Sequence, residues 1–253
     1  MKKYIELSGD QTVSMSDSWY ELTNLDHFWI QWRFKVLKKM CSQFIKPETR
    51  ILEIGCGNGL VMKQFDTVMC ITIDGCDLNK AAFQDLYDVP GNVYLYDIYD
   101  LNPELIGQYD IVVMLDVIEH IDDDLDFLKT ALKYLKDNGL IIIGVPALQS
   151  LYSIYDKQIG HKRRYSIKQV QKLFIEAGLK LTDINFWGLS LLPLTLSRKL
   201  LLSIISKKKT VSLGFKSPHR LFNWFMCQIM KFELFFFDKV ISGNSIMAIG
   251  RKK

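Results

Sequence analysis

The stretch ILEIGCGNGL, residues 51–60, constrains the fold of this chain more than any other. Its first four residues have the apolar, β-branched character of a parallel strand that is buried on both faces. Gly55, Gly57 and Gly59 follow at a spacing of two, which is typical of a tight turn where a ligand approaches bare backbone. From Leu60 the pattern predicts a helix whose free N–H groups face that ligand.

Glu53 lies inside this apolar strand, two residues before the first glycine. A buried carboxylate is unfavourable unless it is paired, so we expect a ligand that is cationic or rich in hydrogen-bond donors. No Gly-Lys-Ser/Thr follows the turn, which excludes a phosphate-binding P-loop. Leu60 stands where the dinucleotide fingerprint of dehydrogenases needs a third glycine, which disfavours that class.

Strand-like and helix-like segments alternate along most of the chain. Helices are expected from Leu25 to near Pro47, from about Asn79, over 123–136 and over 166–177. Strands are expected over residues 50–54, 70–77, 92–97, 110–116, 140–145, 180–186 and 245–250. The alternation predicts an α/β, Rossmann-like fold with a seven-stranded, mostly parallel sheet and helices on both faces.

The 253 residues can form one core with an appended cap. We expect an N-terminal helical cap over 1–47 that begins with a loose lead-in, a core over 48–186 and 244–253, and a hydrophobic helical insertion over 187–243. Within the insertion, residues 220–239 are strongly apolar but carry a polar stripe that argues against a membrane span. A substrate cap, a dimer surface and a helix in the membrane interface all remain open.

Composition limits the classes of partner. The net charge of +4 is mild, and no basic stripe with interleaved aromatics is present, so nucleic acid is not expected. The five cysteines form no CxxC pair, and no cluster of metal ligands is evident.

The N-terminus lacks an apolar secretory region, which predicts a cytoplasmic protein, peripheral on the inner membrane face if residues 220–239 meet a bilayer. The sequence does not indicate an oligomeric state.

Acidic residues follow three successive predicted strands. In an open parallel sheet the ligand binds beyond the carboxyl ends of the strands. Asp77 stands about 20 residues after the glycines, where a carboxylate can bind a ribose diol. Asp97 could hold an adenine amino group, and Asp116 and Glu119-His120 follow the next strand. Each alone could be a helix cap, but together they indicate a nucleoside site.

These motifs resemble those of class I S-adenosylmethionine-dependent methyltransferases. The resemblance rests on ILEIGCGNG, CDLN, YDI, YDIVVMLDVIEHIDDD and LKDNGLIIIGVPA, covers about residues 48–186, and makes SIMAIGRKK the last, antiparallel strand. It implies that S-adenosylmethionine is bound and S-adenosylhomocysteine is the product. The implied cofactor-binding residues are Glu53, Gly55, Cys56, Gly57 and Gly59 for the methionine part, Asp77 and Leu78 for the ribose, Asp97 and Ile98 for the adenine, and Leu115 and Asp116 beside the sulfur.

The segment IGHKRRYSIKQV, from Ile159, resembles a subgroup with Gly-His-x-Arg-Arg-Tyr after strand five, whose members occur in pathways for quinones, lipids and sugar polymers. His161 and His120 are candidates for a general base, or they have structural roles. Arg163, Arg164 and Tyr165 could grip an anionic substrate group, although salt bridges to acids such as Asp156 are an equal alternative.

The aromatic helix expected from Leu25 adds Trp29 as a candidate substrate contact, either in a lid or in the core. Together these features predict a methyltransferase of the EC 2.1.1 type that acts on a small-molecule or lipid-linked acceptor at oxygen. The alternative is a non-catalytic binding or scaffold module, with the same fold, in a membrane-associated biosynthetic complex.

Overall fold

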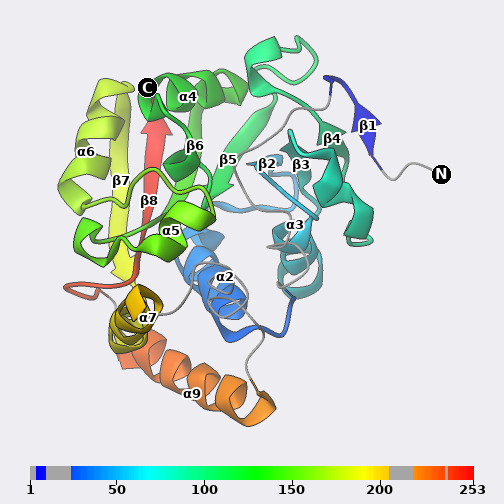
Figure 1. Ribbon diagram of the computed structural model, residues 1–253. Coiled ribbons are helices and arrows are strands. Elements are labelled where there is room, and N and C mark those ends of the chain that lie inside the picture. The colour runs from blue at the N-terminus through cyan, green and yellow to red at the C-terminus, as the bar shows by residue number, and fades with distance from the viewer. Residues whose placement is uncertain (1–3, 10–23, 205–218, 237–238) are drawn as a thin grey trace.

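The computed structural model describes residues 4–9, 24–204, 219–236 and 239–253 (Figure 1). Within these residues eight strands form one sheet in the order β1-β4-β3-β2-β5-β6-β8-β7. All neighbours are parallel except β8, which is antiparallel to both β6 and β7. The strands are β1 (Ile5–Glu6), β2 (Ile51–Ile54), β3 (Asp74–Asp77), β4 (Val93–Leu95), β5 (Tyr109–Leu115), β6 (Leu135–Pro146), β7 (Leu179–Trp187) and β8 (Ser245–Lys252).

Helices cover both faces of this sheet, as alternating strands and helices require. Helices α2 (Phe28–Cys41), α3 (Leu60–Gln64) and α9 (Arg220–Phe236) contribute to the core on one face, and α4 (Asp124–Ala131) and α6 (Ile167–Glu176) to the core on the other. Two further helices, α5 (Ile154–Gln158) and α7 (Leu192–Ile204), pack against each other near the ends of the strands. The predicted α/β class is confirmed.

Successive residues of each strand point to opposite faces, and this divides the core in two. In β2, Ile51 belongs to the cluster with α2 and α3, whereas Leu52 belongs to the cluster with α4 and α6. Both side chains are at most 1% exposed. A strand that is apolar on both faces is therefore buried on both faces, as its sequence predicts.

The predicted number of seven strands was wrong, because Ile5–Glu6 adds an eighth at the sheet edge. These two residues pair with Tyr94 and Leu95 of β4. They belong to the segment that we expected to be a loose lead-in, and most of the rest of that segment lies outside the described residues. Two exposed residues give no periodic signal, so a short edge strand of this kind cannot be distinguished from a loop by pattern.

Several predicted boundaries also differ from those observed. The strand expected from Cys70 begins only at Asp74, because residues 65–69 continue α3 as a π-helical turn that ends in left-handed Cys70. The strand expected over 140–145 already begins at Leu135, so the end of the helix expected over 123–136 lies within β6. By contrast α6 begins at its expected start, where Ser166 and Gln169 form a capping box.

The region between β7 and β8 contains α7 and α9. Helix α9 lies beside α2 and buries Met226, Met230 and Glu233, so one of its faces is part of the core (Figure 1). Asn223 of α9 accepts a hydrogen bond from the Phe28 N–H at 2.8 Å, at the first turn of α2. Among the described residues no helix is long and apolar enough to cross a bilayer.

Candidate functional site

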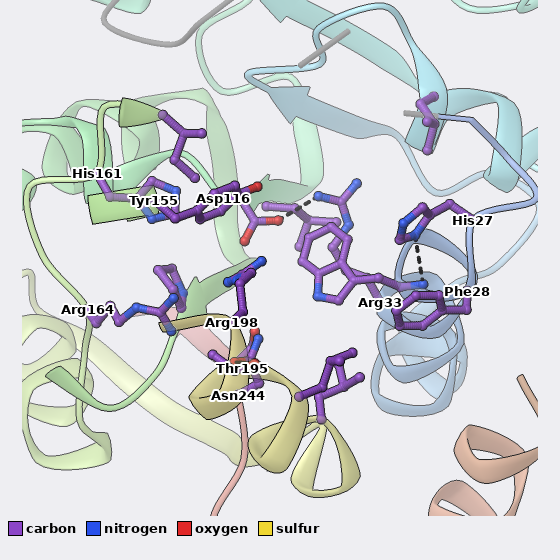
Figure 2. A pocket seen from close by; sticks show the side chains of 18 of the residues that line it. His27, Phe28, Arg33, Asp116, Tyr155, His161, Arg164, Thr195, Arg198 and Asn244 are labelled. Atoms are coloured by element: carbon purple, nitrogen blue, oxygen red, sulfur yellow. Dashed lines mark hydrogen bonds and ion pairs between the residues drawn. The ribbon is translucent and has the colours of Figure 1, made fainter. Parts of the chain in front are cut away.

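A cavity of about 450 Å³ opens beyond the carboxyl ends of β2, β5 and β6 (Figure 2). One part of its wall is the glycine turn after β2, and another is the N-terminal half of α2. The remaining wall comes from residues 155–164 and from helices α7 and α9. The strands thus place the cavity where an open parallel sheet binds its ligands.

The glycine turn has the backbone conformation that its sequence predicts. Gly55, Gly57 and Gly59 all have positive φ, of 78°, 54° and 77°. A Cβ on Gly55 would lie 2.5 Å from Cγ2 of Val117. Gly57 donates its N–H to Asp77 at 2.8 Å, so the carboxylate at the end of β3 fixes the turn. Gly55, Gly57 and neighbouring Cys56 line the cavity, whereas Gly59 begins α3.

Glu53 and Arg33 are buried side by side in the cavity wall and retain unused hydrogen-bonding capacity. Each is at most 5% exposed. Oε2 of Glu53 and Nε of Arg33 have no hydrogen-bond partner in the described structure. Burial raises the pKa of Glu53 to about 8, although the charge of Arg33 opposes this. Unsatisfied buried groups are unfavourable, so both atoms fit a ligand that offers a donor and an acceptor.

Asp116, directly after β5, is held by the same arginine. Nη1 of Arg33 lies 2.6 Å from Oδ2 of Asp116, and Asp116 has a positive φ of 58°. Trp29, on the same helix, packs its ring 5.0 Å from the Arg33 guanidinium and also lines the cavity. The side chain of Arg33 therefore links helix α2 to the end of β5 (Figure 2).

Three side chains that follow β5 and α5 converge at one side of the cavity. Nε2 of His161 lies 3.6 Å from Oε1 of Glu119, and the rings of His120 and His161 meet edge to face at 4.8 Å. Burial raises the pKa of Glu119 well above its usual value, and burial lowers the pKa of His120 to about 3. One potential ligand atom from each residue lies within 4.8 Å of the others, a spacing that could hold one metal ion.

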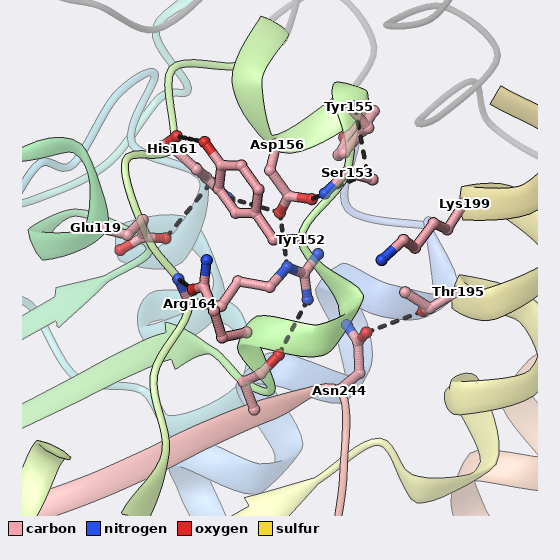
Figure 3. A network of polar contacts seen from close by, with 12 residues as sticks. Glu119, Tyr152, Ser153, Tyr155, Asp156, His161, Arg164, Thr195, Lys199 and Asn244 are labelled. Carbon is pink, nitrogen blue, oxygen red and sulfur yellow. Dashed lines mark hydrogen bonds and ion pairs between the residues drawn. The ribbon is translucent and has the colours of Figure 1, made fainter. Parts of the chain in front are cut away.

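Asp156 of α5 is the centre of a buried polar network (Figure 3). Its carboxylate accepts from Nε of Arg164 at 2.7 Å and from the Ser153 N–H at 2.8 Å, and lies 3.3 Å from Nδ1 of His161. Burial opposes ionisation, but the contacts with His161 and Arg164 hold the pKa of Asp156 below its usual range. The network fixes the positions of His161 and Arg164, both of which line the cavity.

Several of the residues expected at the site lie outside the cavity wall. Asp77 accepts from the Gly57 and Asn79 N–H groups, and Asp97 caps a short helix by accepting from the Tyr99 N–H at 2.9 Å. Leu78 is half-buried and Ile98 is buried next to these acids. These residues lie at the ends of β3 and β4, on the side of the glycine turn away from α7.

The segment Arg163-Arg164-Tyr165 is divided by the fold. Arg164 faces the cavity, but Nη1 of Arg163 lies 3.0 Å from Oδ2 of Asp124, and its Nη2 donates to two backbone carbonyls. The hydroxyl of Tyr165 also donates to Asp124, at 2.7 Å. Arg163 and Tyr165 therefore bind the start of α4 through Asp124, and neither side chain lines the cavity.

Residues that the sequence did not single out complete the wall. Among them are Arg33 and Phe28 of α2, Asn58 of the glycine turn, Tyr155 of α5, Thr195 and Arg198 of α7, Phe222 of α9, and Asn244. One feature of the sequence indicated Arg33, as a cation in a helix whose other buried residues are all apolar. The residues of α7 had none, because they reach the site only through tertiary packing.

The comparisons with known proteins agree with this fold. A family model described as a methyltransferase domain matches residues 23–184, and the chain belongs to that family. A ubiquinone biosynthesis O-methyltransferase of Rickettsia conorii is 29% identical over 111 residues, 42% of this chain and 37% of that protein. A probable S-adenosylmethionine-dependent methyltransferase of Mycobacterium tuberculosis is 22% identical over 193 residues, 73% of this chain and 64% of that protein. The chain spans between a third and a half of the first curated relatives.

Solved structures share the fold at low sequence identity. A phosphoethanolamine N-methyltransferase 2 of Haemonchus contortus, in complex with S-adenosyl-L-methionine, has a TM-score of 0.57 and 18% identity and covers 94% of this chain and 57% of its own. A SAM-dependent methyltransferase of Archaeoglobus fulgidus has a TM-score of 0.54 and 18% identity, over 89% of this chain and 98% of its own. At this identity the likeness concerns the fold alone.

Proposed function

We propose that the protein transfers a methyl group from S-adenosylmethionine to an oxygen of a small-molecule or lipid-linked acceptor held in the cavity. The observation that carries this proposal is the pair of unsatisfied buried groups beside the glycine turn. Oε2 of Glu53 suits an ammonium donor, and Nε of Arg33 suits a carboxylate acceptor. An amino acid moiety presents both groups, and the positive φ values of Gly55 and Gly57 let it approach the backbone.

The remaining cofactor contacts follow from the ends of the strands. Asp77 would bind the ribose and Asp97, with Ile98, would surround the adenine, while Leu115 and Asp116 would stand beside the reacting sulfur. When bound, the cofactor supplies an electrophilic methyl group. The protein holds the acceptor oxygen close to that methyl group and in line with it, and this positioning accounts for much of the acceleration.

His161 is the proposed general base for a hydroxyl acceptor. It lines the cavity, and Asp156 orients its ring through Nδ1. His120 is a weaker candidate, since burial lowers its pKa to about 3 and makes it a poor proton acceptor. Helices α2, α7 and α9 form the proposed cap, which excludes water from the reacting groups.

The decisive measurement is methyl transfer from labelled S-adenosylmethionine into extracts of the source cells. Label should enter an organic-soluble or small aqueous product with the wild-type protein and not with the Asp77→Ala variant. Cofactor binding without label in any fraction would contradict the activity and support a non-catalytic module.

His161→Gln should lower the transfer rate about 100-fold near pH 7 while cofactor affinity is unchanged. The deficit should shrink at alkaline pH, where the acceptor hydroxyl ionises without a base.

A lipid-linked acceptor is favoured by the outer face of α7 and α9. We call this the α7–α9 face; its large apolar side chains that are exposed are Leu194, Leu196, Leu200, Leu201, Leu221, Phe222, Trp224, Phe225, Phe232, Phe235 and Phe236. Exposed apolar side chains in this number are uncommon on proteins that do not bind a partner or a membrane. Leu194, Leu201 and Phe222 also line the cavity, so the face continues into the site.

The charges on the same helices fit an anionic lipid surface. Glu233 is the single acidic residue in the sequences of α7 and α9; it is buried and accepts from the N–H groups of Gly188 and Ser190. The basic residues are Arg198, which faces the cavity, and Lys199, Arg220 and Lys231. An apolar face flanked only by positive charge is typical of an element that lies in the membrane interface. We therefore propose that this face meets an anionic bilayer and that the acceptor enters from it.

Sedimentation with vesicles tests this surface. The protein should bind vesicles that contain phosphatidylglycerol more strongly than neutral phosphatidylcholine vesicles, and Trp224→Ser combined with Phe225→Ser should remove most of the binding. The control is Ile175→Ser, which removes an equally exposed apolar residue on α6, on the opposite face of the sheet. Equal loss in the control, or self-association in place of vesicle binding, would contradict the membrane assignment.

A further inference from the structure

The side of the cavity opposite α2 carries two guanidinium groups and a buried phenol. Arg198 of α7 and Arg164 both line the cavity there, as does Tyr155 of α5. In the view of Figure 2, Arg198 lies between Asp116 and the pair of Thr195 and Asn244, across from His27 and Phe28. None of the activity proposed above requires this group of residues.

Arg198 is held in place by an aromatic ring. Its guanidinium carbon lies 4.2 Å from the centre of the Tyr155 ring, a cation–π contact that fixes the position of the charge. Burial lowers the pKa of Arg198, and the neighbouring Arg164 adds to this effect by repulsion. Two like charges that the fold brings near each other favour an anion between them.

The hydroxyl of Tyr155 gives a second, independent indication. Tyr155 is 4% exposed, and its hydroxyl has no hydrogen-bond partner among the described residues. Burial raises the pKa of Tyr155 to about 12, so the group stays protonated and can donate. A buried donor without an acceptor destabilises a fold by about 1–3 kcal/mol, so its presence in a cavity wall suits an acceptor brought by the ligand.

We propose that Arg198 and Tyr155, supported by Arg164, form an anion subsite that binds a carboxylate or phosphate group of the acceptor. This inference rests on the proposed methyl transfer and specifies its substrate class. The subsite lies beside Asp116, next to the place of methyl transfer, and the apolar residues Leu201 and Phe222 line the same cavity. The acceptor is thus a hydroxyl-bearing acid with an apolar body.

Binding of small probes to the protein saturated with S-adenosylhomocysteine tests the subsite. Benzoate and phenyl phosphate present the two anions, and benzamide is the neutral counterpart of benzoate. At least one anion should bind more tightly than benzamide. Arg198→Met should weaken that binding about tenfold or more, because a charge-assisted hydrogen bond is lost. Tyr155→Phe should weaken it about fivefold. The anion that binds identifies the group as a carboxylate or a phosphate.

The matched control is Lys199→Met, which removes the neighbouring charge of the same helix outside the cavity wall. Equal affinities for benzoate, phenyl phosphate and benzamide, or equal effects of the Arg198 and Lys199 variants, would overturn the subsite. Binding of S-adenosylhomocysteine in the same titrations separates the two proposals. If it is absent in the wild-type protein the methyltransferase proposal fails, whereas intact binding without anion preference overturns the subsite alone.

Discussion

The two sides of the cavity are built in different ways. The side at the glycine turn comes from one continuous stretch, residues 53–58, and from the ends of neighbouring strands. The opposite side is assembled from residues 155–164 and from α7, two segments that α6 and β7 separate in the sequence. The first side depends on backbone conformation together with the buried groups of Glu53 and Arg33, and the second on side chains that packing brings together. The proposed cofactor therefore lies against a wall set by local sequence, and the acceptor against a wall set by packing.

The largest effect is expected at the glycine turn. Gly55→Ala forces a Cβ into a residue with φ of 78°, at 2.5 Å from Val117. The strain displaces the turn against which the amino acid moiety would lie, so S-adenosylmethionine should bind about 100-fold more weakly, a loss of about 3 kcal/mol measured by calorimetry. Gly178→Ala is the matched control, because Gly178 has the same φ of 78° and nothing within 4 Å of its added Cβ. Equal cofactor affinity in the two variants would show that the close approach at Gly55 is not what shapes the site.

On the opposite side the largest effect is expected on stability. Asp156→Asn leaves Arg164 buried without its carboxylate, and the loss of one partner of a buried pair lowers the free energy of unfolding by about 3 kcal/mol. Urea unfolding at pH 7 measures the difference. Asp122→Asn, which removes an exposed partner of Lys162, should leave stability almost unchanged.

The difference in stability between wild type and Asp156→Asn depends on pH, and the direction of that dependence follows from the pKa of Asp156. The pKa of Asp156 is lower in the folded protein than in the unfolded chain, where it is about 4. Its contribution to stability is therefore complete above about pH 4 and is lost as the pH falls through the folded pKa. The difference between wild type and Asp156→Asn should stay constant from pH 7 to pH 5 and shrink below pH 4. A difference that grows on acidification would contradict the assignment of the charge to Asp156.

The different construction of the two sides of the cavity explains which site residues could be predicted from the sequence. The turn at residues 55–59 and the acid Glu53 were predicted correctly in position, because a strand and its following turn are set by neighbours in the chain. The sequence also indicated His161 and Arg164, but could not separate Arg164 from Arg163, since only packing turns one to the cavity and the other to Asp124. The sequence did not indicate Arg198 and Tyr155 as site residues, because their contact depends on how α7 packs against α5.

Protonation of Glu53 offers a smaller effect that probes the cofactor side. Burial raises the pKa of Glu53 to about 8, so the carboxyl is largely neutral at pH 7 in the free protein. An ammonium group bound there favours the ionised form, and binding then releases a proton. Affinity for S-adenosylmethionine should therefore rise about tenfold per pH unit as the pH approaches 8 from below, and level off above it. Glu53→Gln should remove this dependence; an unchanged slope in that variant would assign it to another group.

The smallest effect is expected where α9 meets α2, the contact that joins the cap to the side of the cavity nearest the glycine turn. Asn223 accepts from the Phe28 N–H at 2.8 Å and donates to the Asp26 carbonyl at 2.8 Å, so it satisfies backbone groups at the start of α2. Asn223→Ala should lower the free energy of unfolding by about 1 kcal/mol, measured by urea unfolding. Gln228→Ala, at a half-buried position of the same helix, is the control. Because α2 also carries Arg33, the variant should loosen cofactor binding slightly, whereas the control should not; an effect on stability without any effect on binding would show that α2 holds Arg33 independently of α9.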